Sequence, residues 1–242
     1  MRNINQQYRH SSMGILLAFA PALITAALFA FGRRSHLLAG TTGGVNSAFF
    51  SVVGVLLVQA FLEAFQSGRR LFANHQGMLR RQPIPVEAPM LAALLDLSFH
   101  GFIRLGVMAA MFGAFSVAPR PTLPLALWGL FGVTLGGFGV GTLLAVPAAL
   151  HQDTNVLSAV LPLILFTVTP VFGIAPPESF LGWIQRHNPL AWWFDGIRVA
   201  AYGGEGTLIA AGMGPVVGCL LLLLGWLVCR IARPHVAEKM LG

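Results

Sequence analysis

Charged residues are scarce in this chain. Only 10% of its 242 residues are Asp, Glu, Lys or Arg, whereas soluble globular domains carry about 25%. Hydrophobic residues make up 56% of the chain, and the mean hydropathy is +0.75. Because so few charges cannot cover a water-exposed surface, the composition excludes an ordinary soluble domain and predicts an integral membrane protein.

Lysine is nearly absent, since Lys239 is the only one and is followed by Met240. A phosphate-binding loop needs a glycine-rich turn that ends in lysine and then serine or threonine, because the lysine meets the phosphates and the hydroxyl meets magnesium. We therefore expect no nucleotide site and no other cofactor in this chain. Any use of ATP and Mg²⁺ requires a separate partner subunit.

The sequence also lacks the motifs of hydrolases and zinc sites. It has no Gly-x-Ser-x-Gly elbow and no His-Glu-x-x-His or paired-cysteine ligand set. Its two cysteines, Cys219 and Cys229, lie about 15 Å apart along one predicted helix, too far for a disulfide. We expect no catalytic or metal site. A membrane enzyme that uses Asp96 and His100 as an acid and base remains an alternative, but no nucleophile accompanies them.

Six apolar stretches approach or exceed the roughly 20 residues that a helix needs to cross a bilayer. They cover residues 13–31, 47–66, 90–115, 123–150, 156–172 and 207–231. The first is longer than the core of a signal peptide and five more follow it, so we interpret it as a retained helix. The sequence thus predicts one all-α integral membrane domain over residues 1–242, with six transmembrane helices.

Basic residues are dispersed over short loops instead of forming one patch among aromatics, which argues against nucleic-acid binding. Loops on the cytoplasmic side of a membrane keep an excess of Lys and Arg. With both termini cytoplasmic, five arginines lie on the outer side, including the pair Arg33-Arg34, and nine basic residues lie inside: Arg2, Arg9, Arg69, Arg70, Arg80, Arg81, Arg230, Arg233 and Lys239. The balance predicts that both termini are cytoplasmic.

The longest polar interval is the predicted cytoplasmic loop 68–89. It contains the pairs Arg69-Arg70 and Arg80-Arg81 among apolar residues such as Leu71 and Phe72, so these four arginines are candidates for docking a partner. The alternative is a solvated loop whose arginines only fix orientation. We expect the prolines of this loop to end any helix before the third span, and they are Pro83, Pro85 and Pro89.

Residues 174–206 are too apolar for a solvated loop and too interrupted for a span. Pro176-Pro177-Glu178 and Asn188-Pro189 predict the starts of two short helices. We expect these helices to be re-entrant at the outer interface, where amphipathic aromatics concentrate. The candidates for an outer gate are Trp183, Trp192, Trp193 and Tyr202. A simple aromatic anchor is the alternative.

Several ionisable residues fall inside the predicted spans, where each costs at least about 2.5 kcal/mol to insert. Asp96, His100 and Arg104 are spaced by four and share one helix face, as do Gln59 and Glu63. We expect both faces to point into the protein. They could line a translocation path, or they could join helices by polar contacts alone.

Four stretches occur in the order and spacing of a known family. They are Tyr8 to Leu16 before the first span, Gln76 to Arg81 with Pro85 and Glu87, Asp153 with Thr169-Pro170-Val171, and Asn188-Pro189-Leu190 with Gly196-Ile197-Arg198. The chain resembles ABC-2 type permeases, particularly those that export O-antigen, capsular polysaccharide and teichoic acid. It departs from them in two places. Only seven residues precede Tyr8, and no arginine precedes Asp153.

This resemblance implies a homodimer in the bacterial inner membrane, joined to two copies of an ATPase subunit on the cytoplasmic side. It implies export of a lipid-linked polysaccharide or similar glycolipid across the membrane, with membrane lipid as a further partner of the chain. Export of drugs or lipids by a permease of the same superfamily is an alternative. A carrier driven by an ion gradient is another, because buried Asp, Glu and His residues can serve as proton sites.

Overall fold

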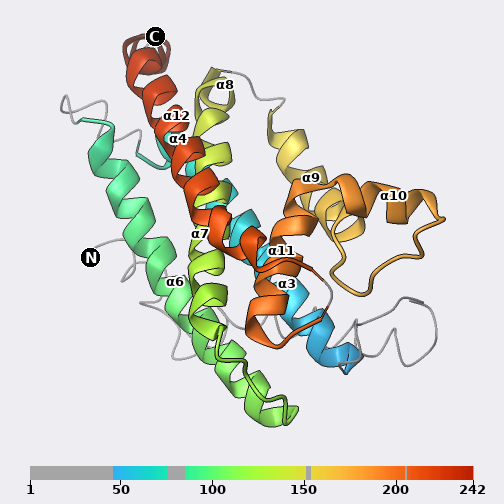
Figure 1. Ribbon diagram of the computed structural model, residues 1–242. Coiled ribbons are helices and arrows are strands. Elements are labelled where there is room, and N and C mark those ends of the chain that lie inside the picture. Colours follow the sequence, from blue (N-terminus) through green and yellow to red (C-terminus); the bar gives the residue numbers. More distant parts are fainter. Residues whose placement is uncertain (1–45, 76–84, 151–153, 205, 242) are drawn as a thin grey trace, which may run out of the picture.

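The described part of the chain is almost entirely helical. The computed structural model describes residues 46–75, 85–150, 154–204 and 206–241, and no strand occurs among them (Figure 1). The helices are α3 (Ser47–Arg69), α4 (Leu71–Asn74), α6 (Glu87–Ala114), α7 (Leu123–Leu143), α8 (Ala145–Leu150), α9 (Thr154–Val168), α10 (Phe180–His187), α11 (Pro189–Ala201) and α12 (Leu208–Leu241). The predicted all-α class is confirmed.

Four of these helices are long and apolar enough to cross a membrane. They are α3, α6, α7 and the Leu208–Pro234 part of α12, and they correspond to the predicted spans that start at residues 47, 90, 123 and 207. The predicted span 13–31 lies outside the described residues. The stretch 156–172 is helical only as far as Val168, in α9, which has 15 residues and contains Pro162. This helix is shorter than the roughly 20 residues of a perpendicular span.

Proline explains one boundary that differs from expectation, whereas another proline leaves its helix uninterrupted. The predicted span 123–150 is divided at Leu144 into α7 and α8. Pro147 lies just beyond this point, and a proline ring clashes with the carbonyl four residues earlier, here that of Leu143. Pro89, in contrast, does not stop a helix. It lies in the first turn of α6, where the missing N–H has no partner to lose, so the expectation that it breaks the helix was wrong.

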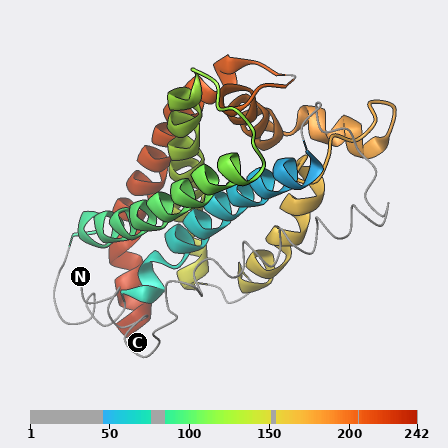
Figure 2. The ribbon, with the colours of Figure 1, turned by 90° about the horizontal axis from the view of Figure 1, so that it is seen from below.

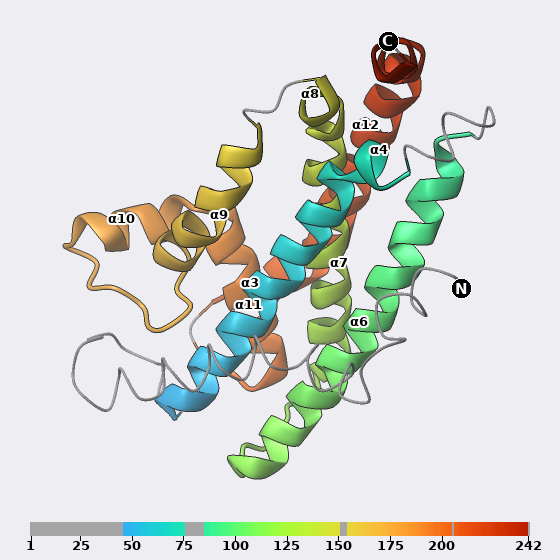
Figure 3. The ribbon, with the colours of Figure 1, turned by 180° about the vertical axis from the view of Figure 1, so that it is seen from behind.

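Glycines of α7 allow this central helix to lie in close contact with its neighbours. In Figure 1, α7 lies between α12 in front and α3 behind, and Figure 3 gives the reverse view. A Cβ atom on Gly137 would lie 2.5 Å from the carbonyl oxygen of Phe61 in α3, and one on Gly139 would lie 2.6 Å from the backbone nitrogen of Leu222 in α12. Because only glycine permits such approaches, α7 joins both neighbours backbone to backbone.

Helix α6 runs along the edge of the bundle beside α3 (Figure 2). Much of its surface is covered by nothing in the described part of the chain, and Phe102 is 74% exposed. Met108 and Phe112, on the other side, pack into the main core with Phe49. The α3–α6 interface is therefore narrow, and any polar residue in it lies close to the uncovered surface.

Candidate functional site

The two predicted polar faces meet across the α3–α6 interface. Arg104 of α6 forms an ion pair and hydrogen bond with the Glu63 carboxylate of α3. His100 Nδ1 lies 3.5 Å from the other Glu63 oxygen. The Arg104 side chain is 14% exposed and that of Glu63 is 33% exposed. The opposite charges compensate each other, which lowers the cost of placing them within apolar helices.

The remaining members of the two faces lie at the margin of this cluster. Asp96 is 43% exposed, and its carboxylate is 4.0 Å from His100 Nδ1. The same Nδ1 lies 2.9 Å from the Asp96 carbonyl oxygen, one turn earlier on α6. Gln59 is half-buried one turn before Glu63. The structure thus brings Glu63, His100 and Arg104 together and leaves Asp96 and Gln59 around them.

Two caps define the broken segment between α9 and α12. The side chain of Ser179 accepts a hydrogen bond from the Gly182 backbone N–H at 3.0 Å and starts α10, later than the expected start at residues 176–178. Asn188 accepts from the Leu190 N–H at 3.0 Å and starts α11, with Pro189 in its first turn, as predicted. In Figure 1, α10, which precedes the break at Asn188, projects sideways from the long helices.

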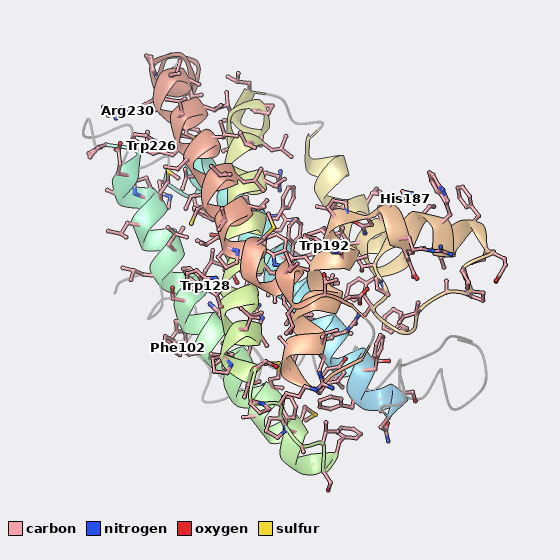
Figure 4. All side chains as sticks on the ribbon, in the orientation of Figure 1. Phe102, Trp128, His187, Trp192, Trp226 and Arg230 are labelled. Carbon is pink, nitrogen blue, oxygen red and sulfur yellow. The ribbon has the colours of Figure 1, made fainter. Side chains whose placement is uncertain are left out.

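The four aromatic gate candidates divide into two groups. Trp183 and Trp192 are 57% and 46% exposed, and the latter is labelled in Figure 4. Trp193 instead packs against Gly136 of α7 and Gly214 of α12, and Tyr202 meets the Phe49 ring edge to face at 5.1 Å. Trp193 and Tyr202 therefore hold α11 against the bundle, so the expectation of a gate applies to Trp183 and Trp192 alone.

Arg198 is a buried residue of this segment that the sequence analysis did not name as a site. It is 3% exposed and donates to Asp195 Oδ1 at 3.1 Å, while its guanidinium carbon lies 4.0 Å from the Phe50 ring centroid. A Cβ atom on Gly54 would come within 2.6 Å of Arg198 Nη2. The signal in the sequence was the Asp-x-x-Arg spacing of α11 together with a glycine in the apolar span 47–66.

Burial changes the acid strength of two groups in this segment. It raises the pKa of Tyr202 to about 12, and its hydroxyl has no hydrogen-bond partner in the described part of the chain. Burial also raises the pKa of Asp195, although the neighbouring Arg198 opposes this shift. Within the same part of the chain, Arg198 Nε and Nη2 have no acceptor. Several buried hydrogen-bond donors of the segment therefore have no acceptor among the described residues.

The docking candidates also differ in accessibility. Arg69 is 3% exposed, and its Nε and Nη2 lie 3.3 and 3.2 Å from Gln66 Oε1, so little of its surface is accessible to a partner. Leu71 and Phe72 are buried as well, in a core cluster with α6, α8 and α12. Arg70 is exposed. The other two candidates, Arg80 and Arg81, lie outside the described residues.

Similarity to known proteins adds no assignment to this geometry. No protein-family model matches the chain, and no curated protein matches it. In the ranges that the structure describes, no group of three His, Cys, Asp or Glu side chains is arranged to hold a metal ion. The described part of the chain is all-helical, with four helices fit to cross a membrane, a charged cluster between α3 and α6, and a broken helix pair beside α7 and α12.

Proposed function

We propose that the chain is the membrane-spanning permease subunit of an ATP-binding-cassette exporter, which moves a lipid-linked polysaccharide or similar glycoconjugate out across the bacterial inner membrane. The observation that carries this proposal is the α10–α11 pair, broken at Asn188 beside long apolar helices. Irregular backbone at membrane depth is tolerated only where protein buries it or where it lines a watery cavity. A broken pair packed against such helices is suited to line a path.

Two contacts couple the region around the α10–α11 pair to neighbouring helices. Asn188 Nδ2 donates to the Val168 carbonyl at 3.4 Å, which joins the start of α11 to the end of α9. Val171 is fully buried, and its backbone lies against Gly54 of α3. In the proposed exporter, a shift of α3 would thus be passed directly to the outer mouth.

The proposed assembly contains two copies of this chain, each with six spans, and two ATPase subunits on the cytoplasmic side. Both termini are cytoplasmic in this arrangement. Because Arg69 is buried, the docking surface within the described residues consists of Arg70 and the exposed Ala73 and Asn74 of α4. The chain supplies no phosphate-binding loop, so every ATP and Mg²⁺ contact belongs to the ATPase.

A site-specific photo-crosslinker tests this assembly in native membranes. We expect a crosslinker at Asn74 to capture a protein that carries a phosphate-binding loop and hydrolyses ATP. The matched control is a crosslinker at Trp183, which is similarly exposed but lies on α10. Capture of the same ATPase from Trp183, or none from Asn74 at normal expression of both variants, would count against the proposal.

A carrier driven by an ion gradient is the second candidate. It is favoured by the cluster of Glu63, His100 and Arg104, since a carboxylate and an imidazole beside a cation can exchange a proton. Proton flux in liposomes separates the candidates. The carrier predicts flux from the chain alone that Glu63→Gln abolishes, whereas the exporter predicts none without ATPase.

A further inference from the structure

A pocket of about 500 Å³ lies between the start of α6 and the last turns of α12. Its lining residues are Pro85, Val86, Glu87, Arg230, Arg233 and Pro234. Two of these are arginines and one is a glutamate, so the lining carries two positive charges and one negative charge. The surplus of one positive charge matches a singly charged anion such as a phosphodiester.

Contacts between α6 and α12 hold these groups in place. Trp226 Nε1 donates to Glu87 Oε1 at 2.9 Å, which joins α12 to the start of α6. The Arg230 guanidinium carbon lies 5.2 Å from the centroid of the Trp226 ring, within the range of a cation–π contact. Figure 4 shows Trp226 and Arg230 on the side of α12 nearest the start of α6. The indole takes one oxygen of the Glu87 carboxylate, whose charge also attracts Arg230 and Arg233. In the described part of the chain no hydrogen bond or ion pair joins either guanidinium to this carboxylate, so the guanidinium donors remain available to a ligand.

The helix surfaces that lead away from the pocket are apolar, and the part of the chain that the structure describes leaves them exposed. Leu91 and Leu95 follow Glu87 at intervals of four residues on α6, and they are 61% and 64% exposed. Leu223 precedes Arg230 by two helical turns on α12 and is 58% exposed. An anionic group in the pocket would thus be followed, toward the middle of both helices, by side chains suited to hydrocarbon.

We propose that this pocket binds a membrane phospholipid, with its phosphodiester between Arg230 and Arg233 and its acyl chains along Leu91, Leu95 and Leu223. Guanidinium groups form bidentate hydrogen bonds with phosphate oxygens, and basic pockets between membrane helices bind anionic headgroups. A free phosphate would leave the apolar surfaces uncovered, and so would an acidic protein segment. The bound lipid requires only that α6 and α12 cross the membrane, so it is independent of what the protein transports.

Native mass spectrometry of the full chain in a mild detergent tests the site. The probes are dioleoylphosphatidylglycerol, dioleoylglycerol, which lacks the phosphate, and inorganic phosphate. The wild-type chain should retain one phosphatidylglycerol molecule and no dioleoylglycerol, and inorganic phosphate should not displace the lipid. In the double variant Arg230→Gln/Arg233→Gln the lipid should bind at least about tenfold more weakly, because charge-assisted hydrogen bonds are lost.

The matched control is Arg120→Gln/Arg186→Gln, which removes the same charge from exposed positions on other elements. Its affinity for phosphatidylglycerol should change less than about twofold, a difference well below that expected for a lost charge-assisted bond. Equal affinity in the two double variants would overturn the proposal. So would binding of dioleoylglycerol by the wild type, displacement of the lipid by inorganic phosphate, or displacement by an acidic peptide. The wild-type comparisons remain decisive even if the pocket variant folds poorly.

Discussion

At the scale of single residues, the ion pair between Glu63 and Arg104 joins two of the long helices of the described bundle. Each charge compensates the other, because an unpaired charge among apolar helices is costly. We therefore expect the interaction energy of the pair to exceed the contribution that either side chain makes to stability through its packing alone.

Glu63→Gln and Arg104→Met should each lower the free energy of unfolding by about 1 to 3 kcal/mol, since each leaves one charge without its partner. The double variant should lose less than the sum of the two. Thermal unfolding in detergent measures all three. The control Asp96→Asn, at a 43% exposed side chain, should change stability by less than about 0.5 kcal/mol. Additive losses would show that the pair is not coupled.

The buried phenol of Tyr202 predicts a dependence of stability on pH. Its pKa is 10.0 for the free side chain and about 12 in the fold, so the unfolded chain releases this proton first as the pH rises. The folded state then binds more protons than the unfolded state, and stability falls between pH 10 and about 12. Ultraviolet absorbance of tyrosinate measures the ionisation of Tyr202, and thermal unfolding measures the fall in stability. In Tyr202→Phe, both the ionisation near pH 12 and this fall should disappear, and their persistence would contradict the burial of the phenol.

At the scale of elements, the glycine-lined surface of α7 determines how closely α3 approaches. Gly141 faces the carbonyl oxygen of Phe65, and any added Cβ atom would overlap it. Backbone atoms cannot move aside as the end of a flexible side chain can. The contact therefore fixes the distance between the two helices.

Gly141→Ala should destabilise the protein by about 1 to 3 kcal/mol through overpacking. The same substitution at Gly106 of α6 is the control, because an added Cβ atom meets nothing within 4 Å there. Gly106→Ala should be neutral or stabilising by up to about 1 kcal/mol, since alanine favours a helix over glycine. Equal effects of the two variants in thermal unfolding would exclude the close approach of α3 and α7.

At the scale of the whole molecule, the long apolar runs were sufficient to predict α3, α6, α7 and most of α12, because hydrocarbon requires an uninterrupted helix. Asn188 and Pro189 predicted the break before α11 for a local reason, the geometry of a helix start. The break at Leu144 was missed because Pro147 is a single helix-breaking residue in an otherwise apolar stretch.

The partners within the site depended on tertiary packing, and the sequence could not supply them. Glu63 lies six residues from the end of α3, whereas Arg104 lies seventeen residues from the start of α6. Counting from the connected ends would have placed Glu63 level with Ala93. Only the axial offset between α3 and α6 brings Arg104 to Glu63, and side-chain packing sets that offset. The burial of Arg69 was hidden for the same reason.

The most direct test of the proposed export function is ATP turnover and glycolipid movement in the same liposomes, with and without the ATPase captured at Asn74. The chain alone should neither hydrolyse ATP nor move substrate, because its only lysine, Lys239, is not in a phosphate-binding loop. Addition of the ATPase should produce both activities together. Sustained ATP turnover by the chain alone, or substrate movement driven by a proton gradient without nucleotide, would contradict the proposal.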